Sequence, residues 1–153
     1  MQFLLSGSAL LEMCLAGDTP VKTWARDKPA AQLRLSLIGI EMARATVNEL
    51  PPARRTRWLR ALEHRINECH QDSGPPLPLD ARVLAEWSAI RKVKPLQHSV
   101  IENGQTILEE IGQDQRLEIA TALAYTLKLV DPWQPFHDQL RAMGLGDHIE
   151  SIR

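Results

Sequence analysis

The chain has 153 residues, which is long enough to bury a sizeable hydrophobic core and predicts a single domain. Its 18 basic and 19 acidic residues give a net charge of -1, so the overall charge does not indicate binding to nucleic acid or to a membrane. No apolar run reaches the roughly 20 residues of a membrane span, and the opening run lacks the flanking basic residues of a secretion signal. The cysteines, Cys14 and Cys69, are too few for a disulfide framework, and we expect a cytoplasmic protein.

Short apolar runs alternate with helical patterns along the chain. Strands are predicted at 3–5, from Leu33 to Leu37 and at 127–130. Ser8 and Asp80 are predicted helix caps, and Pro51-Pro52 separates two helices. The predicted helices are 8–16, 20–26, 39–50, a helix from Pro52 with Trp58, Leu62 and Ile66 on its buried face, a helix with Val83, Trp87 and Ile90 on its buried face, a helix before the last strand, and 136–143.

This alternation is typical of an α/β protein built on a short parallel sheet that is flanked by helices. In such sheets, binding sites form beyond the carboxyl ends of the strands. The positions to consider are therefore those that follow predicted strands, namely 6–8, 39–42, 114–118 and 131–133.

Two segments fit the alternation less well. Residues 92–114 predict a longer connection, in which ILEEIG (107–112) has the pattern of an extra helical turn or two. Pro132 and Pro135 interrupt the chain after the last predicted strand. Residues 132–153 therefore predict a divergent C-terminal extension of a domain that spans 1–153.

Four segments, in this order, carry a resemblance to a known family. They are LLSGSALLEM (4–13), RLSLIGIEMARATVNELPPARRTRWLRALEHRI (34–66), PLDARVLAEW (78–87) and IATALAYTLKLV (119–130). Together they resemble the PIN-domain family, specifically the small ribonuclease toxins of bacterial toxin–antitoxin pairs. The resemblance covers most of residues 3–131 and implies a PIN-type α/β fold, a homodimer, and an antitoxin-like protein or RNA as a partner.

The resemblance also implies a site, and this sequence departs from it. The family gathers carboxylates at the strand ends, where they hold Mg²⁺ or Mn²⁺ for phosphodiester hydrolysis. Its acidic positions fall here on Ser6, Met42 and Gln115, and its first asparagine falls on Ser8. Hydroxyl, thioether and amide groups do not neutralise a hard cation as carboxylates do. We therefore expect a degenerate site without a metal cofactor, in a non-catalytic binding or regulatory protein.

The alternative is an active Mg²⁺- or Mn²⁺-dependent ribonuclease toxin, because acidic residues stand near each lost position. A shift of one residue on a helix rotates a side chain by about 100°, which turns most displaced acids away from a shared site. Such a site would be rebuilt from Glu41, Asp114, Glu118 and Asp131.

The Ser6-Gly7-Ser8 turn and a basic helix face each allow two interpretations. The serines lack the Gly-x-Ser-x-Gly frame of a nucleophile, which favours a helix-capping role. A helix start without an aspartate also suits an anion such as RNA phosphate, which is the second interpretation. A basic stripe on the helix after Pro52 is either a solvated face or a contact for RNA phosphates or an acidic partner; it consists of Arg54, Arg57, Arg60 and His64.

Overall fold

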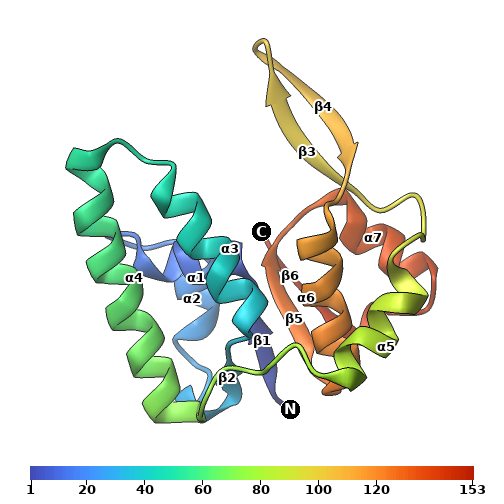
Figure 1. Cartoon of the computed structure of the whole chain (residues 1–153), viewed down its shortest axis with the longest axis horizontal. Coiled ribbons are helices and arrows are strands. Elements are labelled where there is room, and N and C mark those ends of the chain that lie inside the picture. Colours follow the sequence, from blue (N-terminus) through green and yellow to red (C-terminus); the bar gives the residue numbers. More distant parts are fainter.

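The structure, a computed structural model that describes residues 1–153, alternates short strands with helices. In chain order the elements are β1 (Phe3–Leu5), α1 (Gly7–Cys14), α2 (Pro20–Ala25), the 3-10 helix η1 (Ala30–Gln32), β2 (Leu33–Arg34), α3 (Leu37–Asn48), α4 (Pro52–Ser73), α5 (Ala81–Ile90), β3 (Gln97–Glu102), β4 (Gln105–Glu110), α6 (Gln113–Ala124), β5 (Lys128–Pro132), α7 (Pro135–Ala142), the 3-10 helix η2 (Gly146–His148) and β6 (Ile149–Ile152). A four-stranded sheet has the order β2-β1-β5-β6, and β3 and β4 form a separate pair (Figure 1). All neighbours in the four-stranded sheet are parallel, which confirms the predicted fold class.

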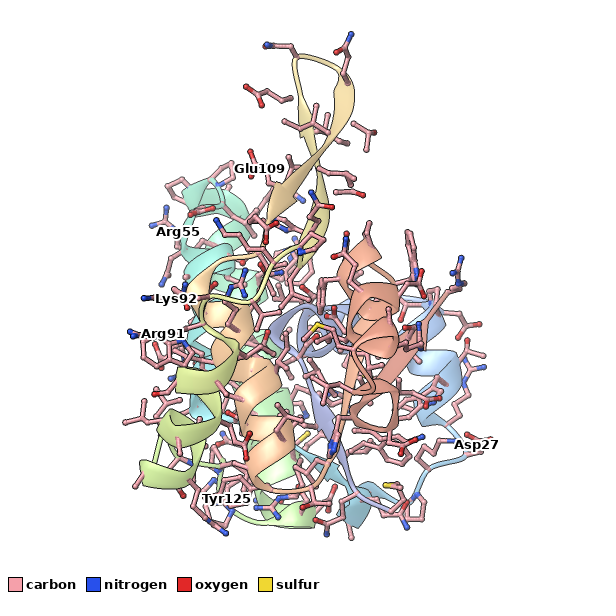
Figure 2. All side chains as sticks on the ribbon, turned by 90° about the vertical axis from the view of Figure 1, so that its right-hand side faces the viewer. Asp27, Arg55, Arg91, Lys92, Glu109 and Tyr125 are labelled. Atoms are coloured by element: carbon pink, nitrogen blue, oxygen red, sulfur yellow. The ribbon has the colours of Figure 1, made fainter.

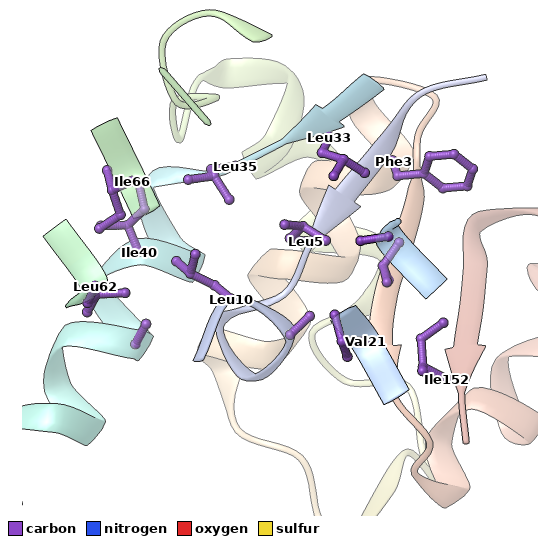
Figure 3. Packing of buried hydrophobic residues seen from close by; sticks show 14 of the residues in the cluster. Phe3, Leu5, Leu10, Val21, Leu33, Leu35, Ile40, Leu62, Ile66 and Ile152 are labelled. Carbon is purple, nitrogen blue, oxygen red and sulfur yellow. The ribbon is translucent and has the colours of Figure 1, made fainter. Parts of the chain in front are cut away.

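The central strand β1 connects two hydrophobic cores, one on each face of the sheet. Successive side chains of a strand point to opposite faces, so Phe3 and Leu5 enter the core beneath α1 to α4, which Figure 3 shows. Leu4 enters the other core, beneath α5, α6 and α7. An unbroken apolar triplet is what a strand buried on both faces requires. No helix has the length and apolarity needed to cross a bilayer.

Side-chain caps fix where four helices begin. Each cap residue accepts a hydrogen bond from the backbone N–H three residues later, which satisfies one of the unpaired donors of the first turn. The pairs are Ser6 with Ala9, Thr19 with Lys22, Ser36 with Gly39, and Asp80 with Val83. Asp80 thus caps α5 as predicted. The prediction for α1 is wrong, because Ser6 rather than Ser8 is its cap.

The predicted extra helical turn in residues 92–114 is wrong, because this segment forms the hairpin of β3 and β4. Asn103 and Gly104 connect the strands with φ values of 51° and 76°. Two residues of positive φ form the tight turn that suits a twisted hairpin, and Asn-Gly is the dipeptide that adopts it most readily. The hairpin projects from the body of the molecule (Figure 1).

Residues 132–153 are part of the central sheet rather than a divergent extension. β6 pairs in parallel with β5, with Ile149 opposite Leu129 and Ile152 opposite Pro132. Ile152 is buried in one core and Ile149 in the other. The two isoleucines are three residues apart, so they break the period of two by which a strand is recognised from sequence.

Candidate functional site

The candidate site lies where β1 and β5 end and α1 and α3 begin. Because β1 and β5 are parallel neighbours, their carboxyl ends bring Ser6 and Asp131 together. The carboxyl ends of the strands are thus where a parallel sheet places a binding site. Glu118 reaches the same place from α6 and bonds to Gly7.

Ser6 is fully engaged within the protein. Its Oγ–H donates to Asp131 Oδ1 at 2.5 Å, and its oxygen accepts from the N–H of Ala9 at 3.0 Å. The side chain is buried. Sequence reasoning identified the capping role but found no acidic partner for this serine, and Asp131 is that partner.

A buried histidine holds the other oxygen of Asp131. His137, on α7, has no exposed surface, and its Nε2 lies 2.9 Å from Asp131 Oδ2. The N–H of Gln134 points at Nδ1, at 3.4 Å, which assigns Nδ1 as the acceptor and leaves Nε2–H to donate to the carboxylate. Ser151 Oγ also lies 2.7 Å from Nδ1 and accepts from Arg141 at 2.7 Å. Asp131 is therefore held by donors on both oxygens.

Glu118 occupies the start of α1, where an anion from outside would bind. Its Oε2 accepts from the N–H of Gly7 at 2.7 Å, and only 4% of the residue is exposed. Burial raises the pKa of Glu118 well above its ordinary value, and the charges of Asp131 and Asp114 raise it further, against the lowering effect of the Gly7 bond. The anion site considered at Ser6-Gly7-Ser8 is thus filled by the protein's own carboxyl group.

Two glycines leave the room that this carboxyl group needs. A Cβ atom on Gly7 would lie 2.9 Å from the carbonyl oxygen of Gly39 and 3.1 Å from Cβ of Met42. A Cβ on Gly39 would lie 3.1 Å from both Glu118 Oε2 and Ser36 Oγ. The starts of α1 and α3 therefore approach each other closely around Glu118.

The other predicted former-site positions have separate environments. Met42 lies beside Gly7 at the site. Ser8 is exposed. Gln115 caps α6, because its Oε1 accepts from the N–H of Gly112 at 3.2 Å.

The displaced acids divide into two groups. Asp114 and Asp131 lie close enough to Glu118 for their charges to affect its pKa. Glu41 is instead exposed on α3 and pairs with Arg44 at 2.7 Å, and that arginine also bonds Glu63. Nowhere in residues 1–153 do three or more His, Cys, Asp or Glu side chains form a group that would hold a metal ion.

The geometry does not form a Ser-His-Asp nucleophile. In that arrangement the histidine stands between the serine and the aspartate and takes the serine proton. Here Asp131 stands between Ser6 and His137, so Ser6 donates to the carboxylate and has no histidine in contact to take its proton. What the arrangement does is fix the ends of β1, β5 and β6 to α7.

The predicted basic stripe is exposed on α4. Arg54, Arg57 and Arg60 form no ion pair, and His64 pairs with Glu68 at 2.5 Å. Arg57 and Trp58 line two cavities, of about 380 and 290 Å³. A third cavity of about 430 Å³ lies between α2 and α4 and is lined by Lys22, Arg26, Lys28 and Arg65 together with Asp18, which pairs with Arg26.

Sequence reasoning missed His137 as part of the site, and it assigned no role to Gly7 and Gly39 although both lie in the predicted site segments 6–8 and 39–42. His137 follows β5 by five residues in a segment interpreted as divergent, so nothing tied it to the strand end. Gly7 and Gly39 carried a signal that was available. A glycine in the first turn after each of two strands indicates close approach of the backbone there.

Comparisons with known proteins were made once this geometry was clear. No protein-family model matches the sequence, and a search of curated proteins gave no significant match. Among solved structures, FitAcB from Neisseria gonorrhoeae has 18% identity and a TM-score of 0.67, covering 99% of this chain and 97% of that chain. FitAB bound to an IR36 DNA fragment has 15% identity and a TM-score of 0.63, covering 98% and 94%.

A third similar structure comes from another toxin–antitoxin system. VapBC2 from Rickettsia felis, bound to a DNA fragment from its promoter, has 10% identity and a TM-score of 0.67, covering 100% of both chains. The toxins of FitAB and VapBC complexes are PIN-domain proteins. This chain has a PIN-like fold. The PIN-like fold spans the whole chain, including the segment 132–153 that the sequence predicted to be divergent.

Proposed function

We propose that this PIN-fold chain is a protein of toxin–antitoxin type that acts by binding a partner and does not cleave RNA. One observation carries the proposal. The two buried carboxyl groups at the strand ends, those of Glu118 and Asp131, take their hydrogen bonds from Gly7, Ser6 and His137 of the same chain. These groups complete the fold, and so they are not free to bind a metal.

The site does not fit a divalent cation. Mg²⁺ needs near-octahedral oxygen ligands that carry negative charge. Burial raises the pKa of Glu118 and so favours its neutral form, Asp131 has a donor on each oxygen, and Met42 offers only a thioether at the position of the family glutamate. We therefore propose that no Mg²⁺ or Mn²⁺ cofactor is used.

The surface of α2 and α4 supports an anionic partner. Although the net charge of the chain is -1, Arg54, Arg57 and Arg60 form no ion pair, and the nearby 430 Å³ cavity carries four cations, of which Arg26, Lys28 and Arg65 pair with Asp18, Asp27 and Glu68. Apolar floor residues such as Met13 and Leu33 in that cavity suit a segment with both acidic and apolar side chains. An antitoxin-like protein has this chemistry, and the similar solved structures are of toxin–antitoxin complexes.

The ribonuclease alternative has one observation in its favour, the proximity of Asp114, Glu118 and Asp131. A single assay decides between the two. Labelled mixed-sequence RNA is incubated with the pure protein in Mn²⁺ and in chelator, beside Asp131→Asn and Glu118→Gln variants. For all three proteins, we expect the same pattern of labelled RNA fragments in Mn²⁺ as in chelator.

Metal-dependent cleavage that disappears in both variants would contradict the proposal and establish a rebuilt site. The same RNA is also examined by gel shift with an Arg54→Glu/Arg57→Glu variant. A shift that these substitutions abolish identifies RNA as the anionic partner. If wild-type protein gives no shift, RNA is excluded as the partner of this surface in the assay, and the protein segment described above is tested next.

A further inference from the structure

Trp58, on α4, differs from the other three tryptophans of the chain in having no partner for its ring. In each of the others a cation lies over the ring: Lys28 over Trp24, Arg91 over Trp87 and Arg153 over Trp133. Trp58 packs partly against the core beneath α4, but no cation and no second aromatic ring lies over it. Its indole N–H is not buried and donates to no group of the chain. Both the ring and its donor are therefore available to a ligand.

Two cavities of different character adjoin Trp58. The cavity of about 380 Å³ is cationic and is lined by Ala53, Arg54, Arg57 and Trp58. The cavity of about 290 Å³ is mostly apolar and is lined by Cys14, Leu15, Ala16, Arg57, Trp58 and Ala61. Arg57 and Trp58 belong to both cavities, so a cationic hollow and an apolar hollow meet at one aromatic ring. Neither cavity shares a residue with the network of Ser6, Glu118 and Asp131.

The two arginines of the cationic cavity have no partner within the chain. Arg54 and Arg57 are exposed, and neither forms an ion pair or a side-chain hydrogen bond. Their neighbour Arg55, at the same end of α4 (Figure 2), is instead held by the carbonyl group of Leu50. The first turn of α4 contains no acidic residue, and α4 forms one side of the molecule (Figure 1). The donors of both free guanidinium groups are thus open to an anion from outside.

We propose that Trp58, Arg54 and Arg57 form a binding site for a nucleoside phosphate. The base stacks on the Trp58 ring in the apolar cavity, because any nucleobase presents a π-face to an aromatic side chain. The phosphate lies in the cationic cavity, where the planar fork of an arginine matches its oxygens. The inference rests on the proposed function only in assigning an anion to the stripe on α4. It adds the base to that anion and so names the class of ligand.

The spacing along α4 supports this division of roles. Arg54 and Trp58 are four residues apart, and Arg54 and Arg57 are three apart, so all three side chains share one face of the helix. Ala61, three residues after Trp58, is small and leaves room beside the ring in the apolar cavity. A ligand with a flat apolar ring joined to an anion matches this order of side chains.

An acidic peptide fits these two cavities less well. An extended peptide draws its affinity from main-chain hydrogen bonds to a strand edge, and the cavities are walled by α4 and the end of α1. Backbone groups within a helix are already paired. Leu15, just after α1, also has its N–H bonded to Glu12 and its carbonyl group bonded to Lys22. A nucleoside phosphate needs only the ring and the arginines.

The first test is isothermal titration calorimetry of the full chain in low salt, without divalent metal. The probes are adenosine 5′-diphosphate (ADP), adenosine, which lacks the phosphate, and inorganic phosphate, which lacks the base. We expect ADP to bind with a Kd on the order of 10⁻⁴ M, and each of the two partial ligands to bind at least about tenfold more weakly. The affinity for ADP should fall as the salt concentration is raised.

The second test repeats the titrations with variants that separate the two halves of the site. Trp58→Leu should weaken ADP binding by roughly 5- to 150-fold, the range for loss of one stacked base, and leave the binding of inorganic phosphate unchanged. Arg57→Gln, at an exposed residue without bonds, should weaken both ligands. The matched controls are Trp87→Leu and Arg91→Gln, because this tryptophan and arginine cover each other on α5. Both controls should bind ADP as wild type does, and thermal unfolding confirms that each variant is folded.

Binding of ADP that depends on both Trp58 and Arg57 would support the proposal. No binding at millimolar ADP would overturn it, and so would equal affinity for ADP and inorganic phosphate, because the stripe would then bind anions without a base. A short oligoadenylate distinguishes the sources of the ligand. Competition at least tenfold stronger than that of ADP assigns the site to an RNA strand, and equal competition assigns it to a free nucleotide; both results support the site. Metal-dependent RNA cleavage would overturn the proposed function and leave these metal-free titrations standing.

Discussion

At the scale of single residues, the decisive feature is the internal hydrogen bonding of the two buried carboxyl groups at the strand ends. Ser6 stands where the resembling family has an aspartate, and it donates to Asp131 at 2.5 Å. Glu118 accepts from the N–H of Gly7 at the start of α1. These bonds hold the carboxyl ends of β1 and β5 against α1 and α6.

The raised pKa of Glu118 makes stability depend on pH. The folded protein keeps this proton at pH values where the unfolded chain has lost it, so stability falls as the pH rises from the unfolded pKa towards the folded pKa. Glu118→Gln copies the protonated form and should remove that loss. We expect the variant to unfold at a higher temperature than wild type at pH 8, by about 2–4 °C for each kcal/mol gained.

The measurement is thermal unfolding between pH 5 and pH 8, with Glu86→Gln as the control because that half-buried carboxyl group makes no hydrogen bond in the structure. The advantage of Glu118→Gln over wild type should grow with pH, whereas Glu86→Gln should show no such trend. An advantage of constant size would show that Glu118 is ionised in the folded protein.

At the scale of elements, Arg116 connects three parts of the second half of the chain. Its guanidinium donates to the carbonyl groups of Ile90 and Val93, at 2.9 and 2.7 Å, and to Glu110 at 3.2 Å. The side chain is 2% exposed. It thereby fixes the end of α5 and the root of the hairpin to α6.

Arg116→Met should lower the free energy of unfolding by about 2–3 kcal/mol, because it removes three hydrogen bonds of a buried guanidinium group. Ile90 and Glu110 keep the bonds that they accept from the N–H groups of Val93 and Leu96, so the Val93 carbonyl group loses most. The loss is smaller than for a fully buried pair, since Glu110 is one-third exposed. Urea unfolding measures it. Arg60→Met, on the exposed face of α4, should change stability by less than about 0.5 kcal/mol; equal losses in the two variants would contradict the role given to Arg116.

The elements also show which sequence signals were sufficient to predict a helix or a strand and which were not. Strong helical spacing and caps such as Asp80 identified α2, α3, α4 and α5, because local patterns determine helix faces. The hairpin was not predicted, although Asn103-Gly104 is a sequence signal for a tight hairpin turn. The adjacent segment ILEEIG also fits a helical turn, and this pattern was given priority. The site depended on contacts such as Ser6 with Asp131, 125 residues apart, and no local pattern contains that information.

At the scale of the whole molecule, β6 joins the two cores. Ile149 belongs to one core and Ile152 to the other, and β6 is the strand that covers the edge of β5. A sequence interpretation that treated residues 132–153 as a divergent part of the domain therefore missed a strand of the sheet, along with His137 and Ser151 of the site network.

Ending the chain at residue 148 should lower the free energy of unfolding by at least about 3 kcal/mol, since burial of each isoleucine contributes roughly 1.5–3 kcal/mol. The exposed β5 edge should also promote aggregation. Thermal unfolding and light scattering measure the two effects. Arg153→Ala, which only removes the cation over the Trp133 ring, should cost less than about 1 kcal/mol, and a truncated chain as stable as this control would refute the role of β6.

The pairing of β1 with β5 has a consequence for the order of events during synthesis. β1 is made first, yet its hydrogen-bonded neighbour β5 begins at residue 128. At 5–20 residues per second, the ribosome needs roughly 6–25 s to make the intervening chain. Throughout that time the apolar Phe3–Leu5 segment has only β2 beside it. The apolar β1 segment therefore lacks one of its two neighbouring strands during most of the synthesis of this domain, and a partner that recognises the completed sheet can bind only once β5 has been made.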